Sequence, residues 1–200
     1  AVVPTPVATA QVCARPVEGS EGGWGTDEID GTGVYTIASL APGDYKVSAQ
    51  APGYVEEFYE EKQDWDSADT VSVQAQETSA NVDFTLEQGG TITGTVTDAD
   101  GPLTQASISV RPADDSPGGY GTQDIDQSGT YTVTGIAGGQ YKVSAQAPGY
   151  VDQFYDGKPD CQSADVIAVT AGETLGDIDF TLTEGGSIAG CVYDGDGQPL

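Results

Sequence analysis

The eleven residues Tyr45–Val55, YKVSAQAPGYV, recur unchanged at Tyr141–Val151. The shift of 96 residues that superposes these two stretches also matches Val12–Gly101 with Ile108–Gly197 without a gap. Self-similarity over roughly a hundred residues indicates one small fold used twice, because a unit of this length can bury a modest core of its own.

Within one repeat the hydrophobic pattern is that of strands. Apolar and polar residues alternate over short segments, and Gly, Pro or Asp clusters that favour turns separate these segments. No segment keeps a helical period, and six or seven short strands per repeat predict a small antiparallel sandwich. In the second repeat the expected strands are Thr91–Thr97, Ala106–Arg111, Thr130–Thr134, Tyr141–Gln146, Asp165–Val169 and Asp177–Leu182.

Several short motifs follow one another in a fixed order. Gly94–Asp98 reads GTVTD, Gly129–Val143 contains GTYTV and GGQYKV, Ala147–Tyr150 reads APGY, and Asp179–Leu182 reads DFTL. This order resembles the carboxypeptidase regulatory-like family. The resemblance implies a prealbumin-like sandwich close to the B-type repeats of bacterial surface adhesins, and modules of this kind serve as stalks, adhesin repeats or accessory domains.

We therefore expect an all-β protein with two tandem antiparallel prealbumin-like β-sandwich domains. Residues 1–88, beginning with a Pro/Thr/Val segment at 1–11, form the first domain, and residues 89–184 form the second. The first domain lacks a counterpart of Gly89–Leu103, which includes the first strand, whereas residues 185–200 repeat that strand with no domain after it. An incomplete sandwich exposes an unpaired edge, so residues 185–200 are predicted to fill the gap in another copy.

Two arrangements of this donor strand stay open. Separate subunits can donate strands head to tail, or the chain can be one period of a longer polyprotein with a covalent joint. An arbitrary chain boundary is the alternative to both. The predicted donor strand consists of Ser187, Ile188, Ala189, Gly190, Cys191, Val192 and Tyr193.

The three cysteines suggest how such a joint is fastened. Thr95 and Ser109 flank one predicted turn almost symmetrically, which makes them cross-strand neighbours if the turn closes a hairpin. The repeat shift replaces them with Cys191 and Cys13, so we expect an intermolecular disulfide between these two residues. Cys161 has no evident mate, and a free thiol and a bridge between fibres both stay open.

The charge balance excludes several function classes. Six basic residues face 32 acidic ones, and the net charge of -26 repels nucleic acid and anionic membrane surfaces. No apolar run is long enough for a membrane helix. The chain contains no histidine for a conventional catalytic triad, and we expect no enzymatic activity. A start at Ala1 rather than Met fits a processed secreted protein or a segment of a longer one, so an extracellular or cell-surface location is expected.

Acidic residues gather at the predicted turns and are candidates for calcium ligands. Carboxylate oxygens are the ligands that Ca²⁺ prefers, and the cation would offset the negative charge that opposes assembly. Plain turn carboxylates are the alternative, since Asp favours turns without any metal. The candidate ligands are Glu28, Asp30, Asp98, Asp100, Asp124, Asp126, Asp194 and Asp196.

Two aromatic residues at matched positions, Trp24 and Tyr120, allow a competing function. Exposed rings can stack on sugars, which would make the chain a carbohydrate-binding accessory module of a larger secreted protein; core or corner packing is the other reading. The main expectation is an extracellular structural protein that forms a head-to-tail fibre or surface stalk from copies of itself.

Overall fold

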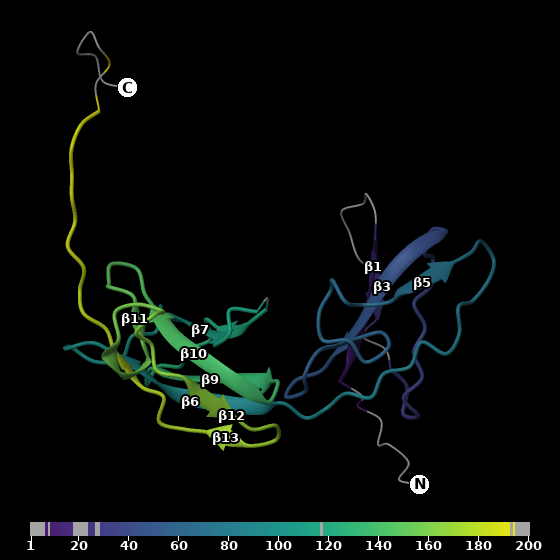
Figure 1. The fold of residues 1–200 in the computed structure, drawn as a ribbon, viewed down its shortest axis with the longest axis horizontal. Helices are drawn as coiled ribbons and strands as arrows, with labels where there is room; N and C mark the ends of the chain where they lie inside the picture. The colour runs from purple at the N-terminus through teal and green to yellow at the C-terminus, as the bar shows by residue number, and fades with distance from the viewer. Residues whose placement is uncertain are drawn as a thin grey trace.

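The computed structural model describes residues 7, 9–17, 24–26, 29–116, 118–192 and 194, with the backbone alone at Trp24 and Thr26. Figure 1 shows the strands in two separate groups. We keep the division expected from the repeat and call residues up to 88 the first unit, residues 89–184 the second unit, and residues 185–192 with Asp194 the tail. No helix of the described ranges is long and apolar enough to cross a membrane. The expected all-β fold is confirmed.

The strands of the first unit form a single sheet. Its order is β2-β1-β3-β4, and β5 pairs with the other end of β3. All of these pairs are antiparallel. The strands are β1 (Gln11–Pro16), β2 (Trp24–Thr26), β3 (Gly43–Gln50), β4 (Glu57–Phe58) and β5 (Thr70–Val73).

The second unit repeats this sheet and adds another. The repeated sheet has the order β11-β10-β7-β8, with β12 also paired to β10. The added sheet has the order β13-β6-β14, with β9 also paired to β6. The strands are β6 (Gly90–Thr97), β7 (Ser107–Pro112), β8 (Tyr120–Thr122), β9 (Thr130–Ile136), β10 (Gly139–Gln146), β11 (Gln153–Phe154), β12 (Ile167–Val169), β13 (Thr174–Leu175) and β14 (Phe180–Thr181), and one 3-10 turn (η1) spans Tyr155–Gly157.

The core of the second unit lies between its two sheets. Period-2 alternation directs every second residue inward, and in β6 Gly90, Ile92, Gly94 and Val96 are buried while the threonines between them are half-buried. Ile92 and Val96 have no exposed surface at all. They belong to one core cluster with buried side chains of both sheets and of the residues that flank β14, among them Ile108, Val110, Tyr131, Val133, Ile136, Val143, Ala145, Ile178, Phe180 and Leu182.

Every strand of the added sheet depends on β6. β9 pairs with it antiparallel, and the short strands β13 and β14 both pair with it in parallel. The described pairings contain no direct ladder between β9, β13 and β14. Removing β6 would therefore leave all three without a partner strand.

The first unit shows this outcome. By the repeat shift, the counterparts of β9, β13 and β14 are residues 34–40, 78–79 and 84–85, and none of these carries a strand. The counterpart of Gly90–Val96 would precede residue 1. Within the described residues, the first unit is thus a one-sheet version of the same fold, as expected for a sandwich without its first strand.

β6 fits its place closely because it carries glycine at its most crowded inward position. A Cβ atom at Gly94 would lie 2.0 Å from the carbonyl oxygen of Ile178, on backbone that cannot move aside as a side chain can. The fold therefore requires glycine at this point of the strand.

Replacing Gly94 with alanine should consequently destabilise the second unit by about 1–3 kcal/mol, the usual cost of overpacking. Gly176→Ala is a matched control, because a Cβ there meets only a methyl group of Thr93 at 3.9 Å. Urea denaturation of the full chain measures both variants. Equal midpoints for Gly94→Ala and Gly176→Ala would contradict the close fit of β6.

Candidate strand-acceptor site

Six apolar side chains of the first unit form a surface that we call the open face. Their counterparts in the second unit are at most 3 % exposed, whereas all six are half-buried in the first unit. They pack on the small core of Val12, Ala14, Tyr45, Val47 and Ala49. In the second unit the equivalent side chains are covered by β6, and the described part of the first unit has no such strand. The open face consists of Tyr35, Ile37, Leu40, Val82, Phe84 and Leu86.

The open face already has the geometry of a completed sandwich. The hydroxyl of Tyr35 donates a hydrogen bond to the carbonyl oxygen of Val82 at 2.5 Å, and Tyr131 makes the equivalent bond to Ile178 at 2.6 Å. The ring centroids of Tyr35 and Phe84 are 6.4 Å apart at 43°, and the second unit's pair is 6.4 Å apart at 42°. Burial raises the pKa of Tyr35 to about 12, so this donor keeps its proton at neutral pH.

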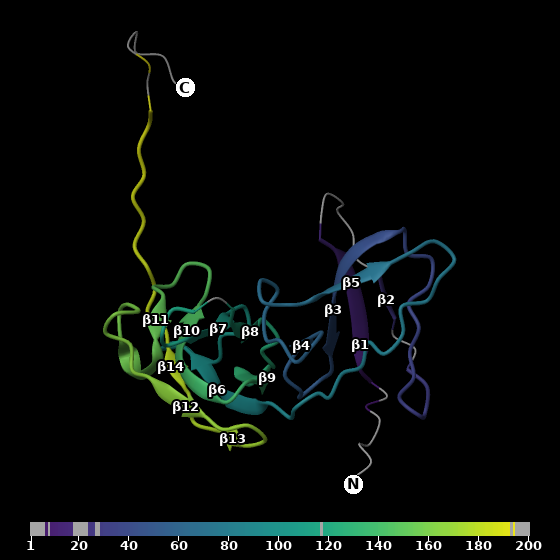
Figure 2. The ribbon, with the colours of Figure 1, turned by 45° about the vertical axis from the view of Figure 1, so that its right-hand side comes forward.

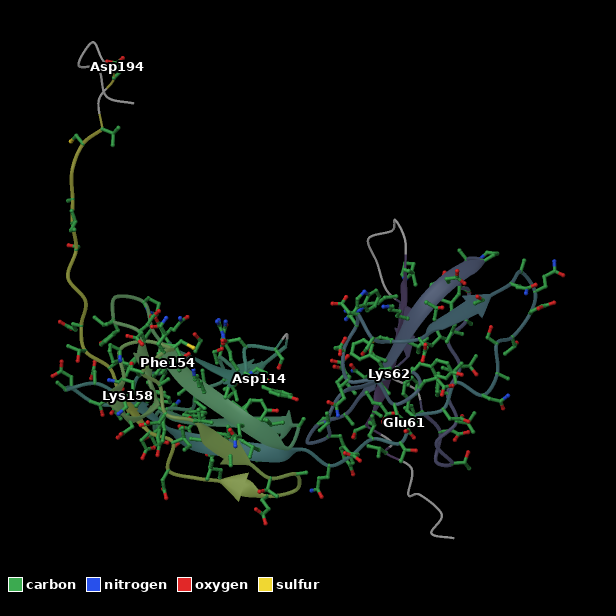
Figure 3. All side chains as sticks on the ribbon, in the orientation of Figure 1. Glu61, Lys62, Asp114, Phe154, Lys158 and Asp194 are labelled. Carbon is green, nitrogen blue, oxygen red and sulfur yellow. The ribbon has the colours of Figure 1, made fainter. Side chains whose placement is uncertain are left out.

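The tail is extended and lies away from both units (Figures 1 and 2). It leaves the second unit where the amide of Gly185 donates a hydrogen bond of 2.8 Å to the carbonyl oxygen of Gly149. Beyond this point Ile188 is fully exposed at 104 % and Val192 is 69 % exposed. Figure 3 shows Asp194 at the far end of the tail, well removed from Phe154 and Lys158 of the second unit.

The two exposed apolar residues of the tail match the two that β6 buries completely. The repeat shift places Ile188 on Ile92 and Val192 on Val96. The spacing of four residues keeps both side chains on one face of a strand. The tail thus carries the same pattern of apolar residues as the inward face of β6, but within this chain it covers no sheet.

The glycines of the tail match in the same way. At Gly90 a Cβ would lie 2.4 Å from Cγ1 of Val169, and at Gly94 it would collide with the backbone of Ile178. The tail has Gly186 and Gly190 at these positions, although nothing lies within 4 Å of either in its own surroundings. No neighbouring atom of this chain requires glycine at these two positions. A strand in the place of β6 would require glycine at both.

A polar contact fixes the end of β6. The hydroxyl of Tyr150 donates to Oδ2 of Asp98 at 2.5 Å, and Oδ1 of Asp98 accepts from the amides of Asp100 and Gly101. The hydrogen bond from Tyr150 lowers the pKa of Asp98, and the same bond raises the pKa of Tyr150 to about 12. The counterparts of this pair are Tyr54 in the first unit and Asp194 in the tail.

The predicted disulfide was based on a hairpin that pairs Thr95 with Ser109, and this prediction is wrong. Thr95 lies in β6 opposite Thr130, whereas Ser109 lies in β7 opposite Ser144 and Gly121, in the other sheet. Both are half-buried residues that alternate with the inward-facing ones, so they lie on the two outer faces of the sandwich.

This register removes the geometric basis for a disulfide between Cys13 and Cys191. A tail in the place of β6 would carry Cys191 on one outer face, while Cys13 is on the other. All three cysteines are free thiols in this structure. Cys161 is half-buried, and its carbonyl oxygen accepts a hydrogen bond from Nζ of Lys142 at 2.8 Å.

The acidic candidates are largely engaged in turns. Oδ1 of Asp30 accepts from the amides of Thr32 and Val34, and Oδ1 of Asp126 accepts from those of Ser128 and Thr130. The hydroxyl groups of Thr32 and Ser128 donate to the same two carboxyls and are the main cause of their lowered pKa, with the backbone amides adding to the effect.

The remaining acidic candidates add no metal cluster. The amide of Asp124 donates to the hydroxyl of Thr122, and Asp100 shares the turn of Asp98. Glu28 and Asp196 lie outside the described residues. Across the described part of the chain no three acidic or cysteine side chains are grouped to hold a metal, so calcium binding stays a prediction.

Of the two aromatic candidates, Tyr120 belongs to the packing of the second unit. Its ring lies 5.9 Å from that of Tyr141, edge to face, and its hydroxyl accepts a hydrogen bond from the amide of Ala137 at 3.0 Å. It packs on the core cluster, which favours the corner role over a sugar-stacking one. The side chain of Trp24 lies outside the described part.

The chain is thus an all-β protein in which the second unit has two sheets and the described strands of the first unit form one sheet with an open face. Residues 91–183 match the family model of the carboxypeptidase regulatory-like domain, which confirms the family resemblance over the second unit. No match was found among curated proteins.

Three solved structures are similar at low identity. The minor pilin GBS52 of Streptococcus agalactiae is 10 % identical with a TM-score of 0.36, covering 94 % of this chain and 88 % of the pilin. The Bacillus anthracis TIE protein is 17 % identical with a TM-score of 0.34, covering 88 % of this chain and 30 % of that protein. The pilus 2b backbone protein of group B streptococcus is 12 % identical with a TM-score of 0.31, covering 90 % and 80 %. Similarity at this level does not assign a function.

Tyr150→Phe should raise the pKa of Asp98, because it removes the main hydrogen bond that stabilises the carboxylate. An NMR titration of the Asp98 carboxyl carbon measures the shift in the full chain. Tyr54→Phe, the same change in the first unit, is the control and should leave Asp98 unaffected. An unchanged Asp98 titration in Tyr150→Phe would show that the Tyr150 hydroxyl does not hold the end of β6.

Proposed function

We propose that this protein is an extracellular structural subunit that assembles head to tail, with the tail of one copy completing the open face of the next. The match between the tail and β6 carries the proposal. Both buried apolar positions and both crowded glycine positions of β6 recur in a segment that covers nothing in its own chain. A strand of this kind supplies main-chain hydrogen bonds and buries alternate side chains in its acceptor.

The pairing of β6 with β9 predicts the register of the joint. Ile92 lies opposite Val133 and Thr95 opposite Thr130, so the repeat shift places Ile188 opposite Ile37 and Cys191 opposite Val34 of the acceptor. Burying Ile188 and Val192 fully contributes about 1.5–3 kcal/mol each. The cost of ordering the tail is about 1–2 kcal/mol per residue, so the ladder of backbone hydrogen bonds is needed as well.

Donation within one chain is opposed by the path of the tail. The tail leaves the second unit on the side away from the first unit in both views (Figures 1 and 2). Gly185 is bound to Gly149, and the three residues from there to Ile188 span at most about 11 Å. The tail therefore points away from the first unit of its own chain. If it completes the open face of another copy, this contact joins two different surfaces of successive copies and propagates into a filament.

The same row of units results if the joint is covalent. In a longer chain the tail would run directly into a following unit, whose open face it would complete in the same register. Charge acts against both arrangements, since a net charge of -26 per chain makes neighbouring copies repel. Salt, or calcium at the predicted carboxylates, would screen this repulsion and favour assembly.

Gly190→Ala should weaken assembly about 10- to 100-fold, because its Cβ would meet the acceptor backbone as a Cβ at Gly94 meets Ile178. Its effect on the unfolding of the single chain should be negligible, since nothing lies within 4 Å of Gly190 there. Ala189→Ser is the control, because its position corresponds to the half-buried Thr93.

Sedimentation velocity over a concentration series measures this difference. The unchanged chain and Ala189→Ser should form oligomers that grow with concentration, and Gly190→Ala should need an about 10- to 100-fold higher concentration to reach the same average size. A wild-type chain that is monomeric throughout, or a Gly190→Ala chain that assembles equally well, would refute strand donation.

The register has its own test in a chain that keeps only Cys191 and gains Val34→Cys, with Cys13→Ser and Cys161→Ser. Directly opposed residues of an antiparallel pair have Cα atoms about 4.5–5.5 Å apart, within the range that a disulfide bridges. Oxidation should give a ladder of covalent oligomers that collapses on reduction in denaturing electrophoresis.

A chain that retains Cys13 and Cys191 but carries Cys161→Ser and the native Val34 is the matched comparison. It should give no ladder, because its two thiols end on opposite faces of the completed sandwich. A ladder from this chain, and none from Val34→Cys, would favour the disulfide expected from the sequence over the register derived from β6.

A further inference from the structure

We infer that the joint between two copies is more open than the joint between the two units of one chain, and that Ser39 sets the difference. The inference rests on the proposed strand donation. Strand donation does not specify how closely the donor's second unit packs against the acceptor's first unit, and the inference concerns this packing.

Backbone atoms of the first and second units contact each other directly at the joint within the chain. Gly135 of the second unit has a φ of 75°, and a Cβ there would lie only 2.6 Å from the carbonyl oxygen of Tyr54 in the first unit. Gly89 connects the units, and its amide donates a hydrogen bond of 2.9 Å to the carbonyl oxygen of Gly53. A Cβ at Gly89 would in turn lie 2.4 Å from the backbone of Gly135. The absence of side chains lets the two units approach this closely.

The donor side of the joint between copies reproduces this arrangement. Gly149 has a φ of 86°, close to the 81° of Gly53. The amide of Gly185 donates to Gly149 at 2.8 Å, as Gly89 does to Gly53. The end of the second unit is thus prepared to meet its acceptor as the first unit meets the second.

The acceptor side does not reproduce it, because the counterpart of Gly135 is Ser39. Ser39 has a φ of 63°, so its backbone has the same left-handed conformation but carries a Cβ. If the joint between copies copied the joint within the chain, this Cβ would fall about 2.6 Å from the carbonyl oxygen of the donor's Tyr150. A carbon and a carbonyl oxygen cannot approach so closely. Rotation of a side chain cannot relieve the contact, because the oxygen belongs to the backbone and the Cβ is bonded directly to it.

A second replacement at the same joint has no such effect. Gln76 stands where the second unit has Gly172, and its φ of 64° is close to the 74° of Gly172. A Cβ at Gly172 would meet only the side-chain amide of Gln88, at an ordinary 3.5 Å. Of these two replacements, only the one at Ser39 produces a steric conflict. The units of successive copies must tilt or separate there, so a fibre would alternate between closed joints within chains and open joints between chains.

One arm of the test does not depend on assembly. In a Gly190→Ala chain at a concentration where sedimentation shows monomer, Gly135→Ser gives the joint within the chain the same Cβ that Ser39 carries and should open it. Gly138→Ser is the control, because a Cβ there has 3.7 Å or more to its nearest neighbours. Small-angle scattering should show a changed maximum dimension for Gly135→Ser alone. Identical profiles for both variants would overturn the inference while leaving strand donation untouched.

The other arm examines the assembled protein by electron microscopy. Filaments of the unchanged chain should show two inter-unit angles in alternation, and Ser39→Gly should bring the two angles together. Ala38→Gly, a change at the exposed neighbouring residue, should keep them apart. Equal angles in unchanged filaments would refute the inference alone, whereas the absence of filaments would refute the proposed function.

Discussion

One strand holds the second sheet of this fold together. β6 is the backbone partner of β9, β13 and β14, and it supplies two of the most deeply buried side chains of the core, Ile92 and Val96. A sheet connected through a single strand cannot form in part, because each remaining segment would have to leave its amides and carbonyl groups to water. The completeness of a unit therefore depends on whether this strand is present.

The two copies of DFTL make this dependence visible. At Asp179–Leu182 the segment contains β14, and Phe180 and Leu182 are buried. At Asp83–Leu86 the same four residues form no strand, and Phe84 and Leu86 are half-buried. The sequence, the local propensities and the neighbouring sheet are alike, so the difference arises from the missing ladder partner rather than from the segment itself.

The proposed assembly of so acidic a chain would require contacts that charge does not oppose. The tail offers such contacts, since its inward positions carry only isoleucine, valine and glycine. The acidic residues are placed where they serve turns, as Asp30 and Asp126 do by accepting several backbone amides each. The inward positions of the proposed joint are thus apolar, whereas Asp30 and Asp126 lie at exposed turns.

The sequence by itself determined the repeat and its strands, because a gapless shift and period-2 alternation are properties of the residues alone. It also showed that the first repeat has no counterpart of β6, whereas the tail repeats that strand. It also predicted the turn after β6, where the amide of Leu103 bonds back to Val96. It could not tell that the chain then crosses to the other sheet, which is why the hairpin of Thr95 and Ser109 was wrong. Only the tertiary structure decided which of two identical segments becomes a strand and that Thr95 and Ser109 lie in different sheets, since a strand exists only with a partner to receive its hydrogen bonds.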